Sequence, residues 1–135
     1  MPDLFVDTNI LIDVLARREP FHRDAIRLFE QAGEKSVRLV TTSTSITTAW
    51  YMLDKYGDSK IARKAIAGII KYVNIIPVSH RAVELAVRSD FRDFEDAVQH
   101  FAALEAGSVD AIITRNTGDF KHSLIRVCRA SDYLA

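Results

Sequence analysis

The sequence predicts an α/β fold of three layers, in which helices cover both faces of a central five-stranded parallel sheet. The first observation is that short apolar or β-branched runs alternate with longer segments whose apolar residues recur at helical spacing. The second is that helical segments, rather than tight turns, separate successive strands, as parallel connections require. The expected strands cover residues 4–6, 37–42, 74–78, 111–114 and 125–128.

The helices between these strands follow from apolar spacing and from the residues at their ends. Apolar residues from Ile10 to Leu15 repeat at helical spacing directly after the first strand, and Thr8 is the expected N-cap. Pro77 interrupts the third strand, which we therefore expect to be short or to lie at a sheet edge. The expected helices cover residues 10–15, 21–32, 45–56, 61–72, 81–89, 93–107 and 131–134.

Length and composition indicate an ordinary globular protein with one domain over residues 1–135. The 18 basic and 18 acidic side chains cancel, so any RNA or DNA contact must use a local groove rather than a strongly basic surface. Cys128 is the single cysteine and cannot form an internal disulfide. Since no apolar run approaches a membrane span and no signal peptide is recognisable, we expect a cytoplasmic protein without membrane contact.

Three separated segments place aspartates where parallel sheets bind ligands, beyond the carboxyl ends of the strands. Asp7 follows the first strand at once, and Asp119 follows the fourth strand. Asp93 and Asp96 open the long helix before that strand, and a spacing of three puts both on one helical face. Each has an ordinary alternative, which is helix capping for the first three and a surface turn for Asp119.

Together these four carboxylates predict a divalent-metal site for phosphoryl transfer. Like charges at close range repel one another unless a cation offsets them, and Mg²⁺ or Mn²⁺ prefers oxygen ligands. The chain has no Cys/His pattern for zinc. Such ions activate water and stabilise the leaving oxygen in phosphodiester hydrolysis, so the expected catalytic residues are Asp7, Asp93, Asp96 and Asp119.

The segments FVDTNILIDVL, DFEDAVQHFAA and IITRNTGDF resemble the PIN-domain family, most closely its branch of VapC-like toxin ribonucleases. The resemblance extends over nearly the whole chain. It implies a Mg²⁺- or Mn²⁺-dependent endoribonuclease that hydrolyses phosphodiester bonds of single-stranded RNA and is the toxin of a toxin–antitoxin pair. It also implies products with 5′-phosphate and 3′-hydroxyl ends, a homodimer and a partner antitoxin.

Carried over residue by residue, the resemblance assigns metal binding to Asp7, Asp96 and Asp119, with Asp93 beside them. Arg115 is a candidate contact for substrate phosphate, and its alternatives are a solvated arginine or a partner of Asp119. The residues expected to orient the acids or metal-bound water are Thr8, Asn9, Thr48, Thr114 and Asn116.

Nearby side chains give weaker indications. Lys121 and His122 could form a basic edge of the site, with a plain surface position as the alternative. His100 stands one helical turn after Asp96, where we expect either a surface histidine or a partner of that acid.

The chain departs from the family pattern in two places. Many relatives carry an aspartate where Asn116 stands, so Asp119 is expected to supply that charge. The family's glutamate in the helix after the second strand is missing, because no acid lies between Val37 and Leu53, and Thr48 stands near its position. One carboxylate fewer weakens the expectation of two-metal binding. A degenerate PIN-like module, which binds RNA or protein and cleaves weakly or not at all, therefore remains open.

Two other classes of α/β protein place an aspartate after a parallel strand. An aspartyl phosphatase requires a second aspartate two residues after the first, where Asn9 stands. A phospho-receiver domain requires an aspartate after the third strand and a lysine after the fifth, where Ser79, His80 and Arg129 stand instead. The sequence therefore favours the nuclease.

Overall fold

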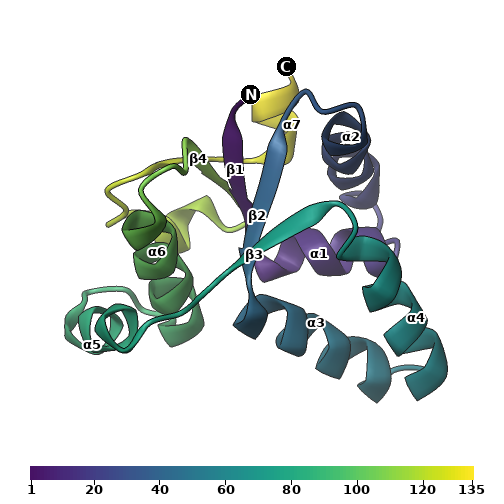
Figure 1. Ribbon diagram of the computed structural model, residues 1–135, viewed down its shortest axis with the longest axis horizontal. Helices are drawn as coiled ribbons and strands as arrows, with labels where there is room; N and C mark the ends of the chain where they lie inside the picture. The colour runs from purple at the N-terminus through teal and green to yellow at the C-terminus, as the bar shows by residue number, and fades with distance from the viewer.

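The computed structural model describes residues 1–135 and shows strands and helices in an alternating order (Figure 1). The strands are β1 (Asp3–Val6), β2 (Arg38–Thr42), β3 (Val73–Ile76), β4 (Ala111–Ile113) and β5 (Arg126–Cys128). The helices are α1 (Thr8–Leu15), α2 (His22–Gly33), α3 (Ser43–Lys55), α4 (Ser59–Ile69), α5 (His80–Arg88), α6 (Phe94–Ala106) and α7 (Ala130–Leu134). A short 3₁₀ helix, η1 (Thr117–Phe120), follows β4 and was not expected from the sequence.

All five strands are parallel and follow the order β3-β2-β1-β4-β5, which confirms the predicted sheet. The first strand is central, and Leu4 pairs with Leu39 of β2 on one side and with Ala111 of β4 on the other. Strand β3 lies at an edge, as the nearby Pro77 predicted.

Side chains alternate across the central strand and define the two outer layers. Leu4 and Val6 point into a core shared with α1, α2, α3, α4 and α7, whereas Phe5 points into a core with Phe120 and Ala103 of α6. Helix α5 packs against α6 on that second side. Figure 1 shows the two groups of helices on opposite sides of the sheet, so the predicted three-layer α/β/α architecture is confirmed.

The starts of α1 and α6 show how two of the aspartates at the sheet edge are placed. Helix α1 begins at Thr8, so Thr8 is not the N-cap; Asp7 holds that position and its side chain makes no capping hydrogen bond. Asp93 does cap α6, because its Oδ1 accepts the backbone N–H of Asp96 at 3.0 Å. Helix α6 ends at Gly107, whose φ of 78° favours glycine.

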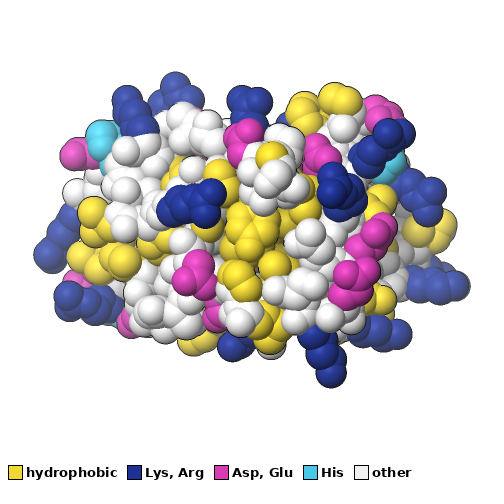
Figure 2. All heavy atoms as spheres, turned by 90° about the horizontal axis from the view of Figure 1, so that it is seen from above, with side chains coloured by type: hydrophobic (Ala, Val, Ile, Leu, Met, Phe, Trp, Pro, Cys, Tyr) yellow, Lys and Arg dark blue, Asp and Glu magenta, His cyan; other side chains and the backbone are white.

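No helix of the structure combines the length and the apolar character that a membrane span requires. On the face shown in Figure 2, acidic and basic side chains are interspersed, which agrees with the zero net charge. His100 is not at the surface: it is only 1% exposed and packs against Phe91 and Phe101, with ring centroids 4.9 and 4.7 Å away. The expectation of a surface histidine was therefore wrong.

Candidate active site

The fold brings the predicted acids together at the carboxyl ends of β1 and β4. Asp7 directly follows β1, Asp93 and Asp96 lie at the start of α6, and Asp119 lies in η1. The charges of Asp7, Asp93 and Asp119 all act on the carboxyl of Asp96. Parallel strands end at one edge of the sheet, so residues separated by more than a hundred positions form one acidic cluster.

Asp7 is the most deeply buried of these acids, with only 2% of its surface exposed. The Thr114 hydroxyl donates a hydrogen bond to Asp7 Oδ2 at 2.8 Å, and the Asp7 backbone N–H donates to the Ile113 carbonyl at 3.0 Å. Burial raises the pKa of Asp7, and the Thr114 hydrogen bond opposes that shift. Thr114 thus orients Asp7 itself, whereas the sequence predicted that it would orient metal-bound water.

Asp96 is the acid whose pKa shows the effect of the cluster most clearly. Burial, followed by the charges of Asp7, Asp93, Asp119 and Glu95, raises the pKa of Asp96 to about 8. In the metal-free protein this carboxyl is therefore mostly protonated at neutral pH. A cation among these groups would remove the repulsion that causes the shift.

Glu95 is a further acid of this cluster, and the sequence analysis did not select it. Its Oε1 accepts a hydrogen bond from the Thr8 hydroxyl at 3.0 Å, and its charge acts on both Asp7 and Asp96. Thr8, which was expected to orient Asp7, therefore contacts Glu95 instead. The three-residue spacing of Asp93 and Asp96 pointed to those two acids and gave no signal for Glu95 between them.

Gln99 is a second missed residue, one turn after Glu95 on α6. It is fully buried, and neither atom of its amide makes a hydrogen bond of good geometry. The amide nevertheless lies close enough to Asp7 to help lower the pKa of that carboxyl. Unpaired buried amides are rare in proteins, and this one lies beside the most buried acid of the cluster.

The donor atoms fit a hard divalent cation, because carboxylate, amide and hydroxyl oxygens surround Asp7 without any sulfur or imidazole ligand. In the structure itself, no three His, Cys, Asp or Glu side chains converge closely enough to enclose an ion. Binding a cation would thus require the half-buried acids of the cluster to change their side-chain rotamers.

Asp119 is held at the outer side of the cluster by an arginine that the sequence analysis did not consider. Arg92 donates from Nη2 to Asp119 Oδ1 at 3.0 Å, and the Arg92 side chain is 88% exposed. Arg115, which was considered as the partner of Asp119, is not that partner.

Arg115 instead pairs with Asp13, a buried acid of α1. Its Nε donates to Asp13 Oδ2 at 2.8 Å, and its guanidinium lies 4.2 Å from the centre of the Phe21 ring. Asp13 is completely buried; burial raises its pKa, and the charge and hydrogen bond of Arg115 oppose that shift. The structure therefore gives Arg115 a structural role and does not support the expected contact with substrate phosphate.

The remaining expected residues are less closely tied to the acids. The Asn116 backbone N–H donates to the Thr114 hydroxyl at 3.1 Å, so Asn116 supports Thr114, while its own side chain is exposed. Asn9 and Thr48 are half-buried and make no side-chain hydrogen bond to an acid. At the start of α3, the buried hydroxyls belong to Thr42 and Ser45, which bond each other at 3.0 Å.

The coupled acids predict a measurable dependence of stability on pH. Asp96 binds a proton more tightly in the folded protein (pKa about 8) than in the unfolded chain (3.8). The contribution of this proton to the free energy of unfolding is complete below about pH 4 and is lost as the pH rises through 8. The free energy of unfolding should therefore fall by about 2 kcal/mol over that range. This value is far below the full shift because the side chain is only partly buried.

The measurement is urea unfolding in EDTA across this range, comparing wild type with Asp96→Asn. Burial lowers the pKa of His100 to about 4, which opposes the trend below pH 6.5, so the clearest window lies between pH 6.5 and 8. The variant should show a flatter profile there. Equal profiles for both proteins would contradict the coupling.

Comparison with known proteins agrees with the fold and the acidic cluster. The sequence matches the family model described as PIN domain over residues 3–118. Ribonuclease VapC1 of Aquifex aeolicus (strain VF5) is 28% identical over 135 residues, which cover 96% of this chain and 92% of that protein.

Solved structures show the same architecture. VapBC2 from Rickettsia felis, bound to a DNA fragment from their promoter, has a TM-score of 0.71 at 14% identity and covers 94% of this chain and 98% of its own. Mycobacterium tuberculosis VapC20, a sarcin-ricin loop cleaving toxin, has a TM-score of 0.63 at 23% identity, with coverages of 81% and 86%. At these identities, both structures support the fold alone.

A toxin–antitoxin complex from Klebsiella pneumoniae is 26% identical, with a TM-score of 0.62 and coverages of 94% and 97%. The family match and the similarity to a named ribonuclease support nuclease activity, which is a hydrolase activity. The resemblance seen in the three sequence motifs is confirmed: the chain belongs to the PIN-domain family.

Proposed function

We propose that the chain is an endoribonuclease that hydrolyses phosphodiester bonds of single-stranded RNA with Mg²⁺ or Mn²⁺, and that it is the toxin of a toxin–antitoxin pair. The observation that carries this proposal is the cluster of acids at the carboxyl ends of β1 and β4, in which burial and neighbouring carboxylates raise the pKa of Asp96 to about 8. Carboxylates held together against their repulsion are a feature of functional sites.

PIN-domain ribonucleases of the VapC type generally depend on a divalent metal ion. In this chain Asp7, Asp96 and Asp119 would hold the ion, and we add Glu95 to the set. When bound, a divalent ion supplies positive charge for the attacked phosphate and an activated water.

The other side chains hold the acids in position. The Thr114 hydroxyl fixes Asp7 through its 2.8 Å hydrogen bond, and the Thr8 hydroxyl fixes Glu95 through its bond of 3.0 Å. Asp93 caps α6 and thereby fixes the backbone that carries Asp96. In the metal-free protein, burial and the neighbouring acids favour the protonated form of the Asp96 carboxyl at neutral pH by raising its pKa. An amide has nearly the same shape as the acid that it replaces, so the role of each acid can be tested by a separate substitution.

A Glu95→Gln substitution is expected to weaken Mn²⁺ binding by about tenfold, because it removes one negative charge beside Asp7 and Asp96. Isothermal titration calorimetry of Mn²⁺ into each protein measures this change directly. Glu30→Gln, which changes an exposed glutamate on α2, is the matched control. Equal Mn²⁺ affinity of Glu95→Gln and wild type would show that Glu95 does not belong to the metal site.

The test of the proposed activity is cleavage of a mixed single-stranded RNA in Mn²⁺ or Mg²⁺, comparing wild type with Asp96→Asn. Metal-dependent cleavage that EDTA stops and that Asp96→Asn lacks is the expected result. A folded wild-type protein that binds RNA but does not cleave it would instead favour the degenerate binding module. The missing glutamate of α3 and the absence of a closed metal cage are the observations behind that alternative.

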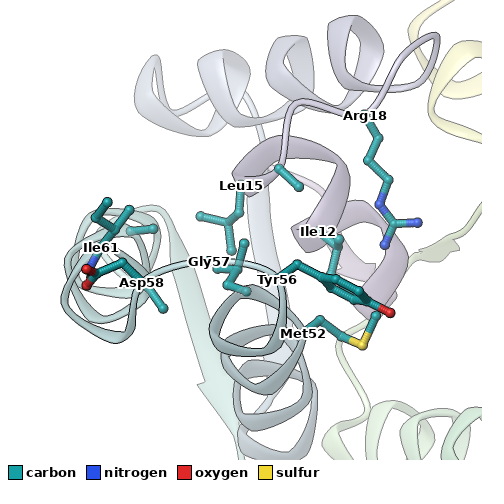
Figure 3. A pocket seen from close by; sticks show the side chains of 12 residues that line it. Ile12, Leu15, Arg18, Met52, Tyr56, Gly57, Asp58 and Ile61 are labelled. Carbon is teal, nitrogen blue, oxygen red and sulfur yellow. The ribbon is translucent and has the colours of Figure 1, made fainter.

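A partner antitoxin is the part of the proposal that the toxin–antitoxin complexes among the similar structures support. The chain offers a site of suitable chemistry away from the acids, a cavity of about 510 Å³ between α1, α3 and α4 (Figure 3). Leu15, Met52 and Ile61 line it together with Tyr56, which is 75% exposed. Such a surface suits an apolar helix or loop of another protein.

The proposal also includes one domain over residues 1–135, a cytoplasmic setting and a homodimer. Light scattering coupled to size exclusion measures the mass of the free protein against the 15.2 kDa of one chain. A monomer at all concentrations would remove the homodimer from the proposal without affecting the nuclease.

A further inference from the structure

A polar cavity of about 430 Å³ adjoins the acidic cluster on the side of Asp119. Its lining contains no hydrophobic residue and consists of Asp90, Arg92, Gly118, Asp119, Lys121 and His122. Asp119 belongs both to this cavity and to the cluster, since its charge also acts on Asp96. The cavity is therefore the immediate continuation of the candidate active site.

Three basic side chains, Arg92, Lys121 and His122, share this cavity with the carboxylates of Asp90 and Asp119. Arg92 uses one guanidinium nitrogen for its 3.0 Å bond to Asp119, and the other donors of its guanidinium make no hydrogen bond within the chain. Lys121 and His122 are exposed and form no ion pair. Arginine and lysine are the side chains that proteins use most for phosphate.

The wall that carries these side chains is anchored to the helix of the acids. The His122 ring packs at the edge of Phe91, 6.4 Å between centroids, and Phe91 in turn contacts Phe120 at 5.9 Å. The buried His100 of α6 accepts the backbone N–H of Leu124 at 3.1 Å. The segment after η1 is thus fixed relative to α6, and the cavity is pre-formed rather than assembled on binding.

An RNA strand at the acidic cluster meets a strongly unfavourable field, because several carboxylates face its phosphates. Besides the proposed metal ion, basic side chains near the cluster would offset this repulsion, since the chain as a whole carries no net charge. We propose that the cavity of Arg92, Lys121 and His122 binds a backbone phosphate of the RNA strand next to the phosphate at the acidic cluster. This inference rests on the proposed ribonuclease function and specifies where the strand continues beyond the cleavage point.

The test is equilibrium binding of a short fluorescein-labelled single-stranded RNA in EDTA, followed by fluorescence anisotropy over a series of salt concentrations. Lys121→Gln is the first variant, because Lys121 has no protein partner whose loss could disturb the fold. We expect its Kd to rise about tenfold. We also expect the slope of log K against log salt to become shallower by about 0.7, the value for one phosphate contact on a single strand.

Arg92→Gln should behave in the same way, and Lys64→Gln is the matched control on α4, at the opposite end of the molecule (Figure 1). The double variant of Arg92 and Lys121 should lower the slope by about twice the single value. Circular dichroism of each variant shows whether the fold is kept.

The outcomes separate this inference from the proposed function. If wild type binds and cleaves RNA while Lys121→Gln and Arg92→Gln match Lys64→Gln in Kd and slope, the phosphate subsite is overturned and the ribonuclease stands. If wild type neither binds nor cleaves RNA, the function fails and the subsite fails with it.

Discussion

An Asp7→Asn variant is expected to lose metal-dependent RNA cleavage by about 100-fold or more, because it removes the most buried negative charge of the proposed metal site. The substitution keeps the shape of the side chain and an oxygen that accepts the Thr114 hydroxyl. It also removes a buried carboxylate beside Glu95 and Asp96, so the free energy of unfolding of the metal-free protein should rise by about 1 kcal/mol at pH 8.

The combination of lost activity and gained stability is the diagnostic result. Cleavage rates in Mn²⁺ and urea unfolding in EDTA measure the two quantities on the same preparation. Asp132→Asn, which changes an exposed aspartate on α7, should alter neither. A variant at Asp7 that is both less stable and inactive would indicate that Asp7 serves the fold rather than the chemistry.

An Arg115→Gln variant is expected to lower the free energy of unfolding by about 3 kcal/mol, because it leaves the completely buried Asp13 without its 2.8 Å partner. The remaining cation near Asp13, Arg18, lies 3.9 Å away and makes no hydrogen bond to it. The loss also includes the stacking of the guanidinium on Phe21.

Urea unfolding at neutral pH measures this loss, with Arg63→Gln on the exposed side of α4 as the control. Adding Asp13→Asn to Arg115→Gln should recover part of the stability, since the double variant no longer buries an unpaired charge. If Arg115→Gln instead weakened RNA binding at unchanged stability, Arg115 would belong to the substrate contact considered from the sequence.

The sequence was sufficient for the architecture because each strand is a short apolar run and each helix has a regular apolar face. Pro77 predicted a third strand that is short or lies at an edge, and β3 ends at Ile76 and lies at the edge of the sheet. The N-cap of α1 was misplaced by one residue, because threonine and aspartate are both good N-caps, and it is Asp7 that has the extended backbone of that position. The sequence of the 3₁₀ helix η1 has no apolar period from which the helix could have been predicted.

The site was predictable only for residues whose position follows directly from the ends of strands and helices. Asp7, Asp93, Asp96 and Thr114 belong to this group. Pairings between side chains from different elements carry no sequence signal, so Arg92 with Asp119 and Arg115 with Asp13 were missed. Gln99 was missed for a related reason. Helices often carry a single polar residue on a buried apolar face, so the sequence pattern did not mark Gln99 as unusual.

The strand order has a consequence for how the protein is made. The strand synthesised first, β1, occupies the centre of the sheet, and its neighbour β4 begins only at Ala111. A chain still emerging from the ribosome therefore lacks half of the ladder around Asp7 until most residues have been translated, and Asp119 arrives later still. Translation fragments that stop before η1 should thus lack the complete acidic cluster and show no nuclease activity.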